Sequence, residues 1–322
     1  MRYDPSDYLY ASARIRAMEN RLLGREKLQQ LLSLDTMDEV LSALADNGYD
    51  GEGGILDICQ RHLEETFRTV ADFLPDPTLI RFLQYPYDCH NLKVLEKCRV
   101  KGTDPAELLI DLGSIPAKDL LTVSENELAD LLPPHMAAGL REARDAFDKT
   151  GNPREIDFVL DRAAYADMAA AASPFPLANQ WVQAKADLTN LLICLRLLRM
   201  QSGDQGQALL SRTMLPGGTL DEAFLSDCYE GGESGLVSAL ARTPYGQIFG
   251  NGLPLSQCEK NADDFLIELT RRARAVSFGA EVPIAYLMAA ETESKNLRIL
   301  LAQKTVGDRA DITKERMRNS YV

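Results

Sequence analysis

Along most of the chain, hydrophobic residues recur among polar ones with the period of an α-helix. Apolar side chains return every three or four positions in four long stretches, residues 10–23, 55–74, 156–172 and 263–278. No comparable run alternates β-branched with polar residues, as a half-buried strand would. Turn-forming residues separate the periodic stretches, at 48–54, 131–134, 173–176, 215–218 and 230–235. The pattern predicts an all-α protein.

A short element recurs three times at the end of such helical stretches. It reads DCHNLKVLEK at 88–97, DLTNLLICLR at 187–196 and ETESKNLRILLAQK at 291–304, each with an acid three residues before an Asn-Leu pair. The preceding helical stretches begin 36, 34 and 33 positions before the Asn. We therefore expect a single domain of three related helical lobes, residues 1–114, 115–215 and 216–322.

A second echo links the outer two lobes. VLSALADNGYD at 40–50 resembles LVSALARTPYG at 236–246, while the less similar ENELADLLPPHM stands at this place in the middle lobe. Pro176 and Pro283 are each followed by an apolar residue and Ala, and we expect both prolines in the first turn of a helix, where a missing N–H is tolerated. Each lobe is thus predicted to end in one long helix that carries an acid and an Asn.

The acid, the Asn and two apolar residues share one face of each long helix, at offsets 0, 3, 4 and 7. Such a face must pack, and a buried amide without partners costs about 1–3 kcal/mol. Either each Asn bonds backbone groups at the end of a neighbouring helix, or the three faces line a common axis and present polar groups to a partner. The position two after the Asn is Lys93, Leu192 or Arg298, so strict threefold contact is not required. The candidate structural or partner-contact residues on these helices are Asp88, Asn91, Lys93, Asp187, Asn190, Arg196, Glu293, Asn296 and Arg298.

Charge and hydropathy limit the possible partners. The net charge of −13 argues against nucleic acid, which needs clustered Lys and Arg. No apolar run approaches the ~20 residues of a spanning helix, and the acidic start MRYDPSDYLY does not resemble an export signal, so we expect a cytoplasmic protein with no direct bilayer insertion. Residues 1–33 and 291–322 each carry +2, against −17 between them. We hypothesise that bases of the two ends lie near one another and near an acidic partner surface, these being Arg14, Arg16, Arg21, Arg298, Lys304 and Arg316.

Few residues suggest catalysis. The three His are isolated, and the six Cys lack a C-x-x-C pair and are read as buried structural residues. The acidic GYDGEGG turn would repel a phosphate, and no cofactor is expected. A metal-dependent enzyme on a helical bundle, using Asp157, Asp161 and Asp167, is one alternative, although Asp167 points to a different helix face. A free-standing helical scaffold is another.

Three stretches resemble a known family. YASARIRAMENRLL, DCHNLKVLEK and above all residues 286–322, YLMAAETESKNLRILLAQKTVGDRADITKERMRNSYV, closely resemble the C subunit of bacterial and archaeal V/A-type ATPases, which is similar to the d subunit of eukaryotic vacuolar ATPases. The resemblance covers nearly the whole chain in order. Leu192 and the Cys89-His90 pair depart from the pattern of the other repeats and bear only on individual contacts.

The resemblance implies three similar lobes in a pseudo-threefold arrangement, forming a funnel with a central cavity. It also implies a non-catalytic central-stalk rotor subunit, peripheral to the cytoplasmic membrane. Its partners would be the rotating shaft and the membrane rotor ring of proteolipid subunits, and its role would be to couple them for ATP-linked transport of protons or sodium ions. The resemblance leaves the ion and the direction of the reaction, synthesis or pumping, open.

Overall fold

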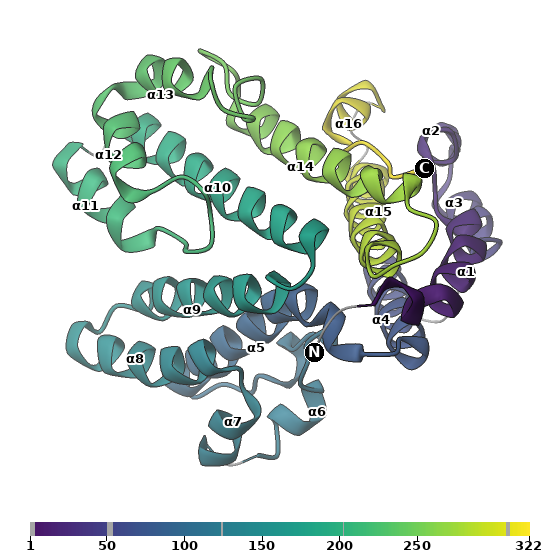
Figure 1. The fold of residues 1–322 in the computed structure, drawn as a ribbon, viewed down its shortest axis with the longest axis horizontal. Coiled ribbons are helices and arrows are strands. Elements are labelled where there is room, and N and C mark those ends of the chain that lie inside the picture. The colour runs from purple at the N-terminus through teal and green to yellow at the C-terminus, as the bar shows by residue number, and fades with distance from the viewer. Residues whose placement is uncertain (1–3, 50–53, 124, 202, 307–309) are drawn as a thin grey trace. The chain divides into compact units, whose positions relative to one another are not determined.

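The regular structure of the protein is helical, as the hydrophobic period predicts. The computed structural model describes residues 4–49, 54–123, 125–201, 203–306 and 310–322, and within them the elements are α-helices and short 3₁₀ turns (Figure 1). Residues 50–53 of the predicted turn at 48–54 lie outside the described residues. The helices are α1 (Leu9–Met18), α2 (Arg25–Ser33), α3 (Met37–Ala45), α4 (Ile55–Phe73), α5 (Arg81–Lys101), α6 (Ala117–Leu120), α7 (Glu125–Leu131), α8 (Pro134–Thr150), α9 (Arg154–Ala172), α10 (Pro176–Arg199), α11 (Gly203–Thr213), α12 (Glu222–Glu230), α13 (Gly232–Leu240), α14 (Leu255–Arg271), α15 (Glu281–Val306) and α16 (Ala310–Arg316).

The chain forms two compact units. Unit 1 comprises Met1–Pro77 and Gly252–Val322, and unit 2 comprises Thr78–Asn251. In Figure 1, unit 1 holds the purple to blue helices α1–α4 and the yellow-green to yellow helices α14–α16, and unit 2 holds α5–α13. The division into three lobes at residues 114 and 215 stays a prediction.

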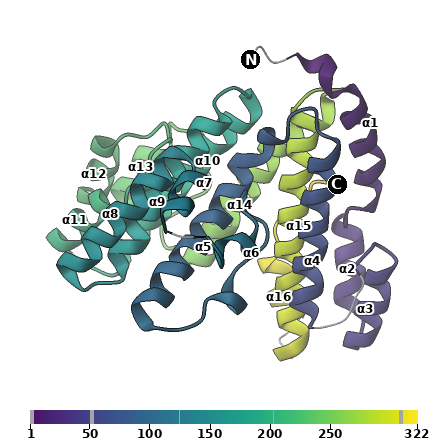
Figure 2. The ribbon, with the colours of Figure 1, turned by 90° about the horizontal axis from the view of Figure 1, so that it is seen from below.

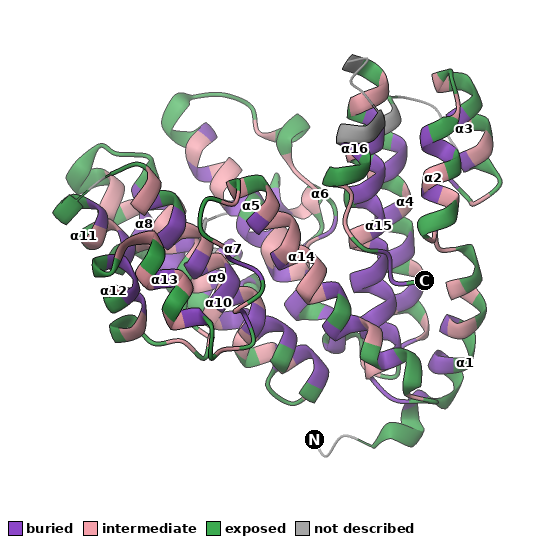
Figure 3. Cartoon of the chain, turned by 90° about the horizontal axis from the view of Figure 1, so that it is seen from above, coloured by how far each residue is buried: buried purple, intermediate pink, exposed green. Residues whose placement is uncertain are grey.

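Helix α15 is the centre of unit 1. It packs against α1, α2, α4, α14 and α16, and α1, α4 and α15 lie side by side in Figure 2. Every residue from 282 to 290 is buried, so this part of α15 is enclosed on all sides (Figure 3). Leucines of α2 and α15 share one apolar cluster with Val40 of α3 and Cys59 of α4. The core of unit 1 therefore joins sequence segments more than 200 residues apart.

Unit 2 is built around α9 and α10. Helix α9 packs against α5, α8 and α10, and α10 packs in turn against α11, α12 and α13. Helix α10 begins at Pro176, and in unit 1 helix α15 begins two residues before Pro283. Both prolines thus stand in a first helical turn, as predicted.

Two predicted helices end earlier than their hydrophobic period suggests, for reasons of tertiary contact. Helix α1 ends at Met18 and a 3₁₀ turn follows to Arg21, after which the chain is extended so that the N–H of Leu23 meets a buried carboxylate on α15. Helix α14 ends at Arg271, and carbonyl oxygens of the following turn accept hydrogen bonds from Arg16.

Candidate functional site

The face that carries the acid and the Asn is buried in α5, α10 and α15. Eleven of its twelve side chains are buried, and Leu95 is half-buried. The twelve are Asp88, Asn91, Leu92, Leu95; Asp187, Asn190, Leu191, Cys194; and Glu293, Asn296, Leu297, Leu300. Three buried carboxyls and three buried amides therefore need partners within the fold.

Each Asn forms a two-bond pair with the backbone of a single residue. The side-chain amide of Asn91 donates to the carbonyl of Ile110 at 2.9 Å, and the N–H of Ile110 donates back to Asn91 Oδ1 at 2.9 Å. The same pairing joins Asn190 to Leu215 and Asn296 to Arg318, at 2.8–3.0 Å. The Asn thus bonds backbone, which is the first of the two interpretations, and each bonded residue stands two positions after the end of a helical element.

In α5 and α10, the acid accepts hydrogen bonds from the same loop that the Asn binds. The donors stand four to five residues after the residue that pairs with the Asn. Asp88 accepts from the N–H and hydroxyl of Ser114 at 3.1 and 2.6 Å, and from the N–H of Ile115 at 3.3 Å. Acid and Asn together form what we call a clamp: two side chains one helical turn apart that hold a loop through its backbone.

The second clamp repeats the first and adds a donor. Asp187 accepts from the N–H and hydroxyl of Thr219 at 2.8 and 2.6 Å and from the N–H of Leu220 at 2.9 Å. The hydroxyl of Tyr245 donates to the same carboxylate at 2.8 Å. Four donors therefore converge on a side chain that is 0% exposed.

A glycine lies directly beneath each of these two aspartates. A Cβ placed on Gly113 or Gly218 would stand under 3.0 Å from Oδ1 of Asp88 or Asp187, a separation that real Cβ atoms essentially never show. The sequences Gly113-Ser114 and Gly218-Thr219 thus supply first a residue without a side chain and then a hydroxyl donor. Gly is required here for close approach and not for an unusual backbone angle.

The third clamp, on α15, holds two separate segments of the chain. Asn296 pairs with Arg318, while Glu293 accepts from the N–H of Leu23 and from the hydroxyl of Tyr49. Leu23 precedes Tyr49 by 26 residues, as Thr219 precedes Tyr245 by 26. By this spacing Leu22 stands where the other two clamps have Gly. A residue with a side chain keeps the backbone further from the acid, and the side chain of Glu293, one methylene longer than Asp, spans that distance.

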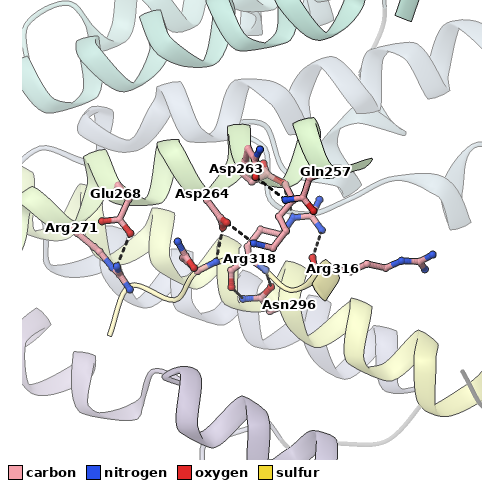
Figure 4. Close-up of polar contacts among 11 residues, drawn as sticks. Gln257, Asp263, Asp264, Glu268, Arg271, Asn296, Arg316 and Arg318 are labelled. Carbon is pink, nitrogen blue, oxygen red and sulfur yellow. Dashed lines mark hydrogen bonds and ion pairs between the residues drawn. The ribbon is translucent and has the colours of Figure 1, made fainter. Parts of the chain in front are cut away.

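The segment after α16 is fixed to unit 1 by a row of further contacts (Figure 4). Arg318 lies between Asn296 on α15 and Asp263 on α14, with its Nε 2.8 Å from the Asp263 carboxylate. Asp264 accepts from the N–H of Asn319 at 2.6 Å, and Arg271 donates to the carbonyl of Ser320. This segment ends residues 286–322, the stretch in which the resemblance is most specific, and these contacts hold it against two helices.

Burial changes the acidity of the third clamp. Glu293 has its pKa raised to about 7 because burial disfavours the carboxylate, and the hydrogen bonds from Tyr49 and Leu23 offset this only in part. The same burial, with the carboxylate of Glu293 beside it, raises the pKa of Tyr49. Burial also raises the pKa of Asp88, against the opposing effect of the bonds from Ser114 and Ile115.

Substituting Glu293 with Gln should flatten the pH dependence of stability. Because the pKa of Glu293 in the folded protein exceeds its ordinary 4.5, the folded state binds more protons than the unfolded chain between about pH 4.5 and 7. The free energy of unfolding should fall as pH rises through this window, by about 3 kcal/mol in total at 1.4 kcal/mol per pKa unit. Urea unfolding at pH 5 and pH 8 measures this.

The matched control is Glu65→Gln, which changes a carboxylate near the surface of α4 that forms no part of a clamp. We expect wild type and this control to share the fall in stability and the Glu293→Gln protein to lack most of it. Equal slopes for all three proteins would show that the Glu293 carboxyl has no part in the pH dependence.

The three aspartates of the metal-enzyme alternative have other partners. Asp161 pairs with Lys93, and Asp157 pairs with Lys97 at 2.6 Å. Asp167 accepts from the N–H groups of His135 and Met136 at the start of α8, at 3.1 and 2.8 Å. In the part of the chain that the structure describes, no three acidic, His or Cys side chains gather as metal ligands would.

The remaining candidate residues are four arginines, one in unit 2 and three in unit 1. Arg196 and Arg298 are exposed, and Arg298 donates to Gln60 of α4. Arg16 is bound internally, to Glu19 at 2.7 Å and to two carbonyls of the turn after α14 at 2.8 and 2.6 Å. The guanidinium of Arg14 lies 4.5 Å from the ring centre of Phe73. These bonds give Arg16 a structural role within unit 1, whereas Arg14 packs against the ring of Phe73.

The two ends of the sequence meet within unit 1. The hydroxyl of Tyr321 donates to Glu19 at 3.2 Å, and Lys304 donates to the carbonyl of Leu32 at 2.9 Å. That the bases of the two ends lie near one another and near an acidic partner surface stays a prediction.

Sequence reasoning missed the residues that the acids hold. The echo between residues 40–50 and 236–246 contains Tyr49 and Tyr245, whose hydroxyls meet Glu293 and Asp187, so this repeat already marked them. The dipeptides Gly113-Ser114 and Gly218-Thr219 follow their acids by 25 and 31 residues, a spacing too variable to recognise without the structure.

Fold and site together define an all-helical protein in which polar side chains of long helices hold neighbouring segments in place. The chain belongs to the ATP synthase (C/AC39) subunit family, whose model matches residues 11–316. It is therefore a non-catalytic subunit of a membrane-associated rotary ATPase or ATP synthase. Both alternatives, the metal-dependent enzyme and the free-standing scaffold, are set aside by this membership. No helix among the described residues is long and apolar enough to pass through a bilayer.

Individual relatives are similar in sequence to this chain over nearly its whole length. The C subunit of the V-type sodium ATPase of Enterococcus hirae is 25% identical over 95% of this chain and 97% of its own length. The C subunit of the A-type ATP synthase of Methanothermobacter thermautotrophicus is 26% identical over 92% of this chain and 84% of its own. That of Methanocaldococcus jannaschii is 22% identical over 94% and 84%.

Proposed function

We propose that this protein is the central-stalk subunit that couples the rotating shaft of a V/A-type ATPase to its membrane rotor ring, for ATP-linked transport of protons or sodium ions. The clamp, present three times in a member of this family, carries the proposal. A coupling subunit must transmit torque without deforming. A loop whose backbone is hydrogen-bonded at two points to buried side chains resists deformation. Charge-assisted bonds, such as those to Asp187, are about twice as strong as neutral ones.

We extend the proposal to the arrangement of the repeats. The acid and Asn of the three clamps fall one pair each in residues 1–114, 115–215 and 216–322, which supports three equivalent lobes around a funnel-shaped central cavity. The foot of the shaft would enter the funnel, and the ring of proteolipid subunits would lie below it at the cytoplasmic face of the membrane. The relatives come from a sodium ATPase and from ATP synthases, so either ion fits the proposal.

Reconstitution of the complex tests this role. Membrane vesicles that contain the complex without this chain should hydrolyse ATP without moving ions, and adding the chain should restore ATP-driven uptake. Dyes for pH and isotopic sodium measure the two candidate ions separately. Transport that is equally fast with and without the chain, or failure of the chain to copurify with shaft and ring subunits, would refute the proposal.

A further inference from the structure

Helices α1 and α15 begin and α4 ends at the same end of unit 1 (Figure 2). Several apolar side chains of these segments are exposed. Leu9 is 52% exposed, Tyr10 66% and Phe278 42%. Ser12 of α1 accepts from the N–H of Gly279 at 3.2 Å, which ties the loop that carries Phe278 to the first turn of α1. Apolar side chains from two distant segments therefore share this end.

Tyr10 contacts two neighbouring side chains at this end, Phe73 and Arg14. The rings of Tyr10 and Phe73 meet edge to face, with centroids 6.4 Å apart and planes at 89°. Arg14 lies over the Phe73 ring and donates to the Tyr10 hydroxyl at 3.4 Å. Exposed Tyr and Arg that are already ordered lose little entropy when a partner binds, and both are enriched among residues that dominate binding energy.

Acidic residues belong to the same segments as these apolar groups. Asp7 precedes α1, Asp76 follows α4 and Glu281 is the first residue of α15, so acids from three separate segments lie at this end. Residues 4–14, 72–76 and 278–281 contain five acids and one base, Arg14. This end of unit 1 is thus apolar at its centre and acidic at its rim.

We propose that this surface docks a protein segment that carries basic side chains beside apolar ones, on another subunit of the same complex. Apolar groups of that segment would cover Leu9, Tyr10 and Phe278, and its base would lie among Asp7, Asp76 and Glu281. The charge of the sequence ends suggested an acidic partner. This surface calls for a basic partner instead, because its acids outnumber its one base, Arg14. An anionic lipid surface would be repelled by the same rim. The inference rests on the proposed function, since it takes its partner from the assembled complex.

Binding to vesicles that contain the complex without this chain tests the surface. Labelled protein is titrated, and we expect Tyr10→Ser combined with Phe278→Ser to weaken binding at least tenfold. Asp7→Lys should weaken it several-fold at low salt and less at high salt, because salt screens an exposed charge. Asp7→Asn should fall between wild type and Asp7→Lys.

Matched controls change the same residue types elsewhere. Met200→Ser removes an apolar group that is 69% exposed, and Asp148→Lys reverses an acid on α8, far from this end in the sequence. Both should bind as wild type does, and all variants should keep the wild-type circular dichroism and unfolding midpoint. If wild type binds and the surface variants bind within twofold of it, the inference is wrong. If wild type itself does not bind, the proposed function fails instead. Tight binding to protein-free vesicles of the same lipids, lost in the variants, would assign the surface to the bilayer and also overturn the inference.

Discussion

Replacing Asp187 with Ala should lower the free energy of unfolding by about 5 kcal/mol, because four donors lose their acceptor and each buried unsatisfied donor costs ~1–3 kcal/mol. Those donors are the N–H groups of Thr219 and Leu220 and the hydroxyls of Thr219 and Tyr245. Water cannot replace the carboxylate fully, since Asp187 is 0% exposed. A loss of this size is comparable to the whole stability of many domains, about 5–15 kcal/mol.

Urea unfolding measures the loss, and hydrogen exchange locates it. The amides of Thr219 and Leu220 should lose most of their protection, while amides in the middle of α9 should change only with global stability. Asp187→Asn keeps one acceptor oxygen and should lose about half as much. Asp227→Ala, which truncates an acid of α12 outside the clamps, is the control and should change stability by less than about 0.5 kcal/mol. A similar small effect at position 187 would mean that the second clamp contributes little to stability.

Replacing Gly218 with Ala should destabilise the protein by about 2–4 kcal/mol, although it adds only one methyl group. The new Cβ would overlap Asp187 Oδ1, and neither the loop nor α10 can move away without losing clamp bonds. Overpacking a rigid site costs typically ~1–3 kcal/mol, and a broken buried bond adds about 1 kcal/mol.

The control for this substitution is Gly235→Ala on α13. A Cβ there meets nothing within 4 Å, and Ala is favoured over Gly in a helix by up to about 1 kcal/mol, so this variant should be unchanged or slightly more stable. Differential scanning calorimetry of the two variants separates the steric effect from the general effect of losing a glycine. A Gly218→Ala protein as stable as wild type would show that the loop relaxes, and that a glycine is not needed beneath Asp187.

The two clamps in unit 2 and the one in unit 1 differ in their hydrogen bonds. Asp187 accepts from three donors of one loop and from a fourth, Tyr245. Glu293 accepts from two donors, Leu23 and Tyr49, while Asn296 pairs with Arg318. Leu23 offers no hydroxyl where Ser114 and Thr219 do. The acid of the third clamp therefore accepts fewer hydrogen bonds than the other two, and burial raises its pKa to about 7.

The sequence by itself determined the all-helical class, the three acid and Asn elements, the burial of their shared face and the family resemblance, because each of these is written in local periodicity or in contiguous motifs. Only the tertiary structure decided what the acids and amides hold. Ile110, Leu215 and Arg318 present backbone groups, which are the same in every residue and leave no mark in the sequence. The tertiary structure also decided where α1 and α14 end, since these ends follow from contacts between distant segments and not from helix propensity. One such contact is that of Arg16 with carbonyls more than 250 residues away.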